Sequence, residues 1–60
     1  MKNLHFINGG TSEINIEKEG RKWVYFMAKT TGIRYRVDKE SGEVQVAPYW
    51  STIKGIYVTD

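Results

Sequence analysis

The strongest constraint in this sequence is the regular spacing of its turn signals, which recur about every ten residues. That spacing is typical of short antiparallel strands rather than of helices. The first signal is Asn8-Gly9-Gly10, and Asn-Gly is the strongest short-range indicator of a hairpin. Three further signals end in a glycine that can adopt a positive φ angle: Glu19-Gly20, Thr30–Gly32 and Lys39–Gly42. Four turns predict five strands.

The segments between these turns are rich in β-branched and aromatic residues, which favour strands. Most of them alternate between apolar and polar residues, as where Ile14 and Ile16 flank Asn15, so each has one face for a core. The predicted strands are Leu4–Ile7, Ser12–Glu17, Lys22–Lys29, Ile33–Asp38 and Glu43–Ala47.

The C-terminal part follows a different pattern. Pro48 has no amide hydrogen and interrupts the strand ladder, so we expect a single helical or 3₁₀ turn within residues 49–53. Ile56–Val58 predicts a sixth strand that is able to close the sheet. The sequence therefore predicts one all-β domain, residues 1–60, with five or six antiparallel strands in a meander. This arrangement is similar to a small SH3-like barrel.

Length and composition limit what this domain can be. A chain of 60 residues buries only about 60% of the surface that its unfolded form exposes. It has no cysteine, so neither a disulfide nor a thiolate zinc site can supplement the small core. The absence of cysteine favours a reducing, cytoplasmic setting. No stretch approaches the roughly 20 apolar residues of a membrane span, so we expect a soluble protein with no membrane partner.

The segment Lys22–Lys29 breaks the alternation, because its six central residues are all apolar or aromatic. Its register against the next strand decides which side chains enter the core. With a three-residue loop, Thr30–Gly32, the inward set is Trp23, Tyr25 and Met27, and the outward set is Val24, Phe26 and Ala28. A loop of two or four residues exchanges the two sets. In either register, one face combines three apolar side chains with Arg34 and Arg36.

The following hairpin predicts which face of residues 33–38 is buried. A four-residue loop, Lys39–Gly42, pairs Asp38 with Glu43 and places Val37 opposite Val44. The same register puts Arg36 opposite Gln45 on the outer face.

The mixed face predicts a binding surface, because aromatic residues, methionine and arginine are enriched at protein interfaces. Basic residues also gather here, with five between Arg21 and Arg36 and no acidic residue among them. The candidate partner-binding residues are Arg34, Arg36, Trp23, Phe26, Lys29, Tyr49 and Trp50. A second hypothesis is a nucleic-acid-binding barrel, in which bases stack on the aromatic rings. A third is structural: Leu4, Phe6 or residues 49–53 cover the face.

Catalysis finds no support in the sequence. His5 is the only histidine and has no neighbouring acid or nucleophile in the sequence, and no cysteine is present to complete a metal site. Gly9-Gly10 lacks the Lys-Ser/Thr that follows the glycines of a phosphate-binding loop. We therefore expect no enzyme, cofactor or metal. The favoured hypothesis is a small binding protein that docks onto a larger protein as an inhibitor or regulator, with a homodimer as a further possibility.

Overall fold

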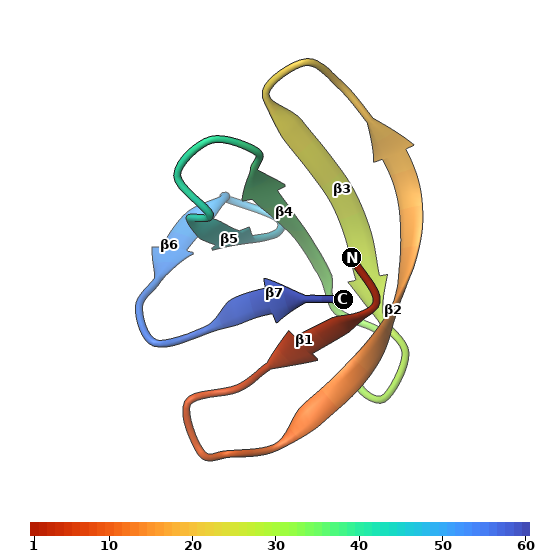
Figure 1. The fold of residues 1–60 in the computed structure, drawn as a ribbon, viewed down its shortest axis with the longest axis vertical. Coiled ribbons are helices and arrows are strands. Elements are labelled where there is room, and N and C mark those ends of the chain that lie inside the picture. Colours follow the sequence, from red (N-terminus) through yellow and green to blue (C-terminus); the bar gives the residue numbers. More distant parts are fainter.

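The computed structural model describes all 60 residues and contains seven β-strands and no helix (Figure 1). No element could therefore cross a membrane as an apolar helix. The strands are β1 (Asn3–His5), β2 (Thr11–Glu19), β3 (Trp23–Ala28), β4 (Arg34–Asp38), β5 (Val44–Val46), β6 (Ser51–Ile53) and β7 (Tyr57–Thr59).

All seven strands belong to one antiparallel sheet in the order β6-β5-β4-β3-β2-β1-β7. Strands β1 to β6 form a meander, and β7 returns to pair with β1, so the two termini lie close together (Figure 1). Strands β6 and β7 are the two edges of the sheet, yet residues 54–56 alone connect them. Such a connection spans at most about 14 Å. The sheet must therefore curl into a half-barrel, in which no ladder joins β6 to β7.

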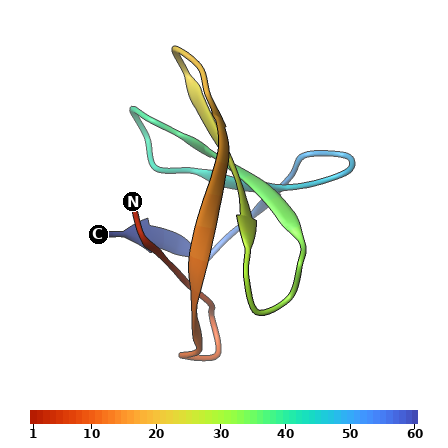
Figure 2. The ribbon, with the colours of Figure 1, turned by 90° about the vertical axis from the view of Figure 1, so that its right-hand side faces the viewer.

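The long strand β2 links the two halves of this curled sheet (Figure 2). Its first residues, Thr11–Glu13, pair with β1, and the stretch from Ile14 to Glu19 pairs with β3. A register shift between Ile16 and Lys18 marks a β-bulge. A bulge bends its strand and increases the local twist, which assists the curl of the sheet.

The hydrophobic core fills the concave side of the half-barrel. Alternate residues of β3 and β4 point into it, and Phe26 at its centre is fully buried and stacked on Tyr35, with ring centroids 5.6 Å apart. The nine core residues are Leu4, Ile14, Val24, Phe26, Ala28, Tyr35, Val37, Val44 and Ile56. Every strand from β1 to β5 contributes at least one of them, so the whole curl closes around one cluster.

Of the registers that the sequence leaves open between β3 and β4, the structure has the one with a four-residue loop. The Ala28 N–H donates to the Ile33 carbonyl oxygen at 3.0 Å, which leaves a loop of four residues, Lys29–Gly32. Gly32 closes this loop with a φ of 72° and donates its N–H to the Ala28 carbonyl at 2.8 Å. The alternative register therefore holds, and the side chains of Trp23, Tyr25 and Met27 lie on the outer face with the arginines.

The register predicted for the next hairpin is confirmed. The Asp38 N–H donates to the Glu43 carbonyl at 2.9 Å across a four-residue loop. Val37 lies opposite Val44, and Arg36 lies opposite Gln45.

The helical turn predicted within residues 49–53 is absent. Residues 47–50 form a turn that contains a cis peptide bond before Pro48, and Ser51–Ile53 pairs with β5 as strand β6. Because the turn reverses the chain, Ser51–Ile53 lies opposite β5, and its backbone bonds to that strand instead of forming a helical turn. The extra strand raises the count from the expected five or six to seven.

The burial of Phe26 generates a prediction about stability. Phe26→Ala should lower the free energy of unfolding by about 3–5 kcal/mol, because it removes a fully buried ring. A domain of this size has a total stability of only about that amount, so the variant should be largely unfolded. The neighbour Met27 on the outer face is the control, and Met27→Ala should cost about 1 kcal/mol or less. Urea denaturation checks both values, and a larger loss for Met27→Ala would contradict the register.

Candidate functional site

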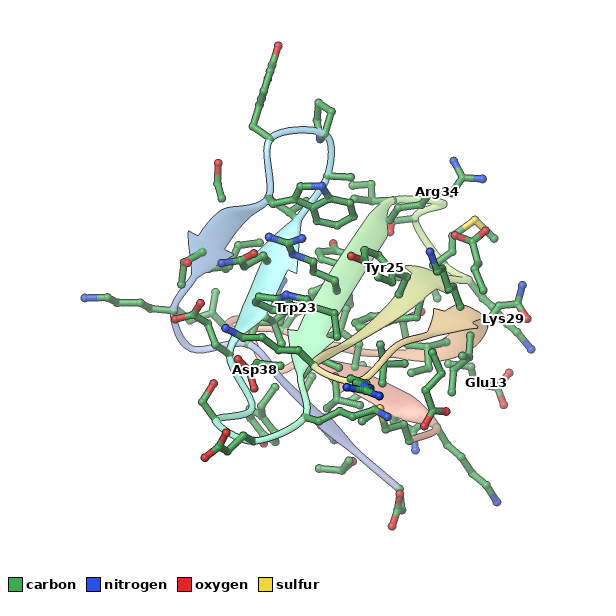
Figure 3. The ribbon with its side chains drawn as sticks, turned by 90° about the horizontal axis from the view of Figure 1, so that it is seen from above. Glu13, Trp23, Tyr25, Lys29, Arg34 and Asp38 are labelled. Carbon is green, nitrogen blue, oxygen red and sulfur yellow. The ribbon has the colours of Figure 1, made fainter.

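The outer, convex face of β3 and β4 carries the residues that alternate with the core. Trp23, Tyr25 and Met27 of β3 share this face with Arg34 and Arg36 of β4. All of them except Arg34 are half-buried. No strand or loop covers the face except the turn that carries Trp50, so this partial burial comes from side chains that pack on one another (Figure 3).

The centre of this face is a cluster of Trp23, Arg36 and Trp50, here called the Trp–Arg–Trp cluster. The guanidinium carbon of Arg36 lies 4.1 Å from the ring centroid of Trp23 and 4.7 Å from that of Trp50. Cation–π contacts at these distances are each worth about 0.5–2 kcal/mol, depending on how well water is excluded. The Arg36 Nε also donates to Gln45 Oε1 at 2.7 Å. The guanidinium group is thus fixed in both position and orientation.

Gln45 is held in turn by its own neighbours. Its Nε2 donates to Glu43 Oε2 at 3.0 Å and to Thr52 Oγ1 at 3.3 Å. The bond to Thr52 crosses from β5 to β6, and both bonds leave the side-chain oxygen Oε1 of Gln45 free to accept from Arg36. The amide therefore acts as a support for the Trp–Arg–Trp cluster.

Trp50 reaches the cluster from an unusual backbone conformation. Its φ is 56°, in the left-handed region, which costs a residue with a side chain about 1–2 kcal/mol. Its ring contacts Arg36 and also meets Tyr25 edge-on, with centroids 5.5 Å apart and planes at 76°. These contacts offset the backbone cost. The preceding residue, Tyr49, is 87% exposed at the tip of the same turn.

Charged side chains surround the cluster, and most are paired within the chain. Arg34 Nε donates to Glu17 Oε1 at 2.9 Å, and Lys22 Nζ lies 3.8 Å from Asp38 Oδ2. The amine of Lys18 lies over the Tyr25 ring at 5.9 Å. The bulge of β2 allows Glu17 and Lys18 to contact this one face together.

The predicted site residues are only partly brought together. Trp23, Arg36 and Trp50 meet directly, with Arg34 and Tyr49 at the periphery. The assignment of Phe26 was wrong, because the four-residue loop directs its side chain into the core. Lys29 lies in that loop, 4.0 Å from Glu13 and far from Trp23 (Figure 3). Tyr25, Gln45 and Lys18 belong to the site but were not among the candidates.

The alternative in which other segments cover the face holds only for Trp50. Leu4 and Phe6 pack against the core on the concave side and do not approach the outer face.

A separate pocket of about 530 Å³ opens on the concave side, at the end of the half-barrel. Its lining includes Phe6, Ile7, Thr30, Tyr35 and Ile56. It contains no carboxylate, histidine, lysine or arginine, so its threonine hydroxyls have no adjacent base. The chain also has no group of three or more His, Cys, Asp or Glu side chains that could hold a metal.

Asp38 anchors the edge of the outer face through its carboxylate. Its Oδ1 accepts the backbone N–H groups of Glu40 at 2.8 Å and Ser41 at 3.2 Å. These two bonds, together with the ammonium group of Lys22, lower the pKa of Asp38 below its usual value. The charged carboxylate therefore holds both the β4–β5 loop and the lysine beside Trp23.

The lowered pKa predicts how stability depends on pH. Since the folded-state pKa is depressed, the Asp38 charge stabilises the fold above the unfolded-state pKa of about 3.9, and this contribution is lost as pH falls through the lower folded-state value. Asp38→Asn should therefore be less stable than the wild-type chain at pH 7. The difference should shrink as the pH falls below about 4. Urea denaturation across this range checks the prediction, and a difference that grows on acidification would contradict it.

The comparisons with known proteins found no relative of this chain. No protein-family model, no curated protein and no solved structure matches the chain.

Proposed function

We propose that this chain is a non-enzymatic binding protein that docks its outer sheet face onto a larger protein, as an inhibitor or regulator. The observation that carries the proposal is the Trp–Arg–Trp cluster, held on a face that no other strand covers. Tryptophan, tyrosine and arginine supply most of the energetic hot spots of protein interfaces. Here all three residue types lie in contact at one place.

The order within this face supports binding with a small entropic cost. Immobilising a flexible side chain at an interface costs about 0.5–1.5 kcal/mol. Arg36 is already fixed by two rings and by Gln45, and Trp50 is already fixed by Tyr25. A partner therefore meets a surface whose long side chains have lost much of their freedom before binding.

The size of the chain fits docking onto a larger partner. A standard interface buries about 800 Å² on each side. The chain exposes 4154 Å² in total, so such an interface would occupy roughly a fifth of its surface. One sheet face of a half-barrel can supply that area.

A nucleic-acid partner is a weaker hypothesis for the same face. Bases bind such surfaces by stacking on open aromatic rings, whereas the rings of Trp23 and Trp50 already contact the Arg36 guanidinium. Phosphates would also have to compete with carboxylates that pair with Arg34 and Lys22. The net charge of +2 adds little long-range attraction for nucleic acid.

Three further expectations stay predictions: the SH3-like classification, the cytoplasmic location and the homodimer.

Affinity capture tests the proposed function. The tagged wild-type chain should retain a protein from a lysate of its own source cells, and Arg34→Glu with Arg36→Glu should weaken that binding on the order of 100-fold, because two cations on the face are reversed. The control is Lys2→Glu with Lys54→Glu, which changes the net charge equally by replacing exposed lysines outside the face. This control should bind as the wild-type chain does.

Two results would contradict the proposal. One is equal capture by both double variants. The other is a complex with generic DNA or RNA that weakens steeply with salt, with a log–log slope near 0.7–0.9 per phosphate contacted, while no protein is retained.

A further inference from the structure

The Arg36 side chain has hydrogen-bonding capacity that the chain itself does not use. Its Nε donates to Gln45, but neither terminal nitrogen, Nη1 or Nη2, donates to any group of the chain. No buried side-chain nitrogen or oxygen lacks a partner, so both terminal nitrogens reach solvent. The guanidinium therefore presents its outer fork to whatever binds the face.

The charges that surround Arg36 leave it without a carboxylate of its own. Glu17 pairs with Arg34, and Asp38 accepts two backbone N–H groups beside Lys22. Glu43 is linked to Arg36 only through Gln45, because its carboxylate accepts from the Gln45 amide and not from the guanidinium. Arg36 is thus the one arginine between β2 and β5 that is rigidly held and still unpaired with an acid.

We propose that Arg36 binds a carboxylate of an acidic segment of the partner protein, through two parallel N–H···O bonds from Nη1 and Nη2. This inference rests on the proposed function and names the chemistry of the partner. The planar fork of arginine matches a carboxylate in this way, and such charge-assisted pairs are stronger than neutral hydrogen bonds. The two indole rings that contact the guanidinium hold the fork in place before the carboxylate binds.

The acids at the rim of the face favour an isolated carboxylate over a polyphosphate chain. Glu17, Asp38 and Glu43 lie around the cluster on β2, β4 and the β4–β5 loop. A nucleic-acid backbone carries a charge at every nucleotide and would bring neighbouring phosphates towards these acids. A protein segment with one or two acidic side chains avoids that repulsion.

Solution NMR of the full, isotope-labelled chain tests the inference with a defined probe. The blocked peptide acetyl-Gly-Glu-Gly-Glu-Gly-amide should cause saturable shifts of the Arg36 Hε signal and of the indole N–H signals of Trp23 and Trp50. The same peptide with glutamine in place of glutamate should cause none. Arg36→Lys keeps the charge but loses the planar fork, so it should bind the glutamate peptide about tenfold more weakly.

Arg21→Lys is the matched control, because Arg21 is an exposed arginine in the turn between β2 and β3 and is not one of the residues of the outer face. It should change the affinity by no more than about threefold. Backbone spectra show whether each variant is folded. Equal binding by Arg36→Lys and the wild-type chain would overturn the inference, as would shifts centred on residues outside the face. Tighter binding of a ten-nucleotide oligothymidylate than of the glutamate peptide would overturn it too.

The result separates this inference from the proposed function. If the wild-type chain captures a protein through the outer face but does not bind the glutamate peptide, only the carboxylate inference fails. If the peptide binds at Arg36 and no protein is captured, the proposed function fails and the carboxylate site stands.

Discussion

The core and the binding surface both depend on the register between β3 and β4. A shift of that register by one residue would move the side chains of β3 to the opposite faces of the sheet. Three apolar side chains of β3 point to each face, so the hydrophobic pattern of that strand does not select a register. The four-residue loop closed by Gly32 does, and it pairs Phe26 with Tyr35. The same pairing places Tyr25 opposite Arg36 on the outer face.

The curl of the sheet then determines which side of the sheet holds the core and which side is left to the outer-face side chains. Two edge strands joined by residues 54–56 must approach each other, and a sheet that curls this far encloses its core on one side only. On the convex side, Arg36 lies against the rings of Trp23 and Trp50. The surface is therefore built by side-chain contacts rather than by a second layer of secondary structure.

Much of this organisation could be predicted from local sequence signals. The glycine-containing turns predict the meander. The alternation of Val44 and Val46 with polar neighbours predicts the hairpin of β4 and β5. The presence of a face that mixes aromatic residues with Arg34 and Arg36 followed from either register.

Other features depend on contacts that a local pattern does not contain. Strand β6 has three residues, two of them polar, and exists because the preceding turn places it against β5. The bulge near Glu17 interrupts a strand that reads as regular, and it pairs Lys18 with Tyr25, where a regular register would pair Glu17. Trp50 takes a left-handed conformation that glycine would normally supply, so only its tertiary contacts account for its place in the cluster.

The binding surface depends on one arrangement: Arg36 contacts two indole rings on the outer face of a sheet whose register buries Phe26. The proton NMR shifts of the Arg36 side chain test it most directly, because protons above an aromatic ring are shifted upfield. The Arg36 δ and ε protons should lie clearly upfield of those of a free arginine and should move back in both Trp23→Ala and Trp50→Ala. Shifts of a free arginine in the folded wild-type chain would contradict the account.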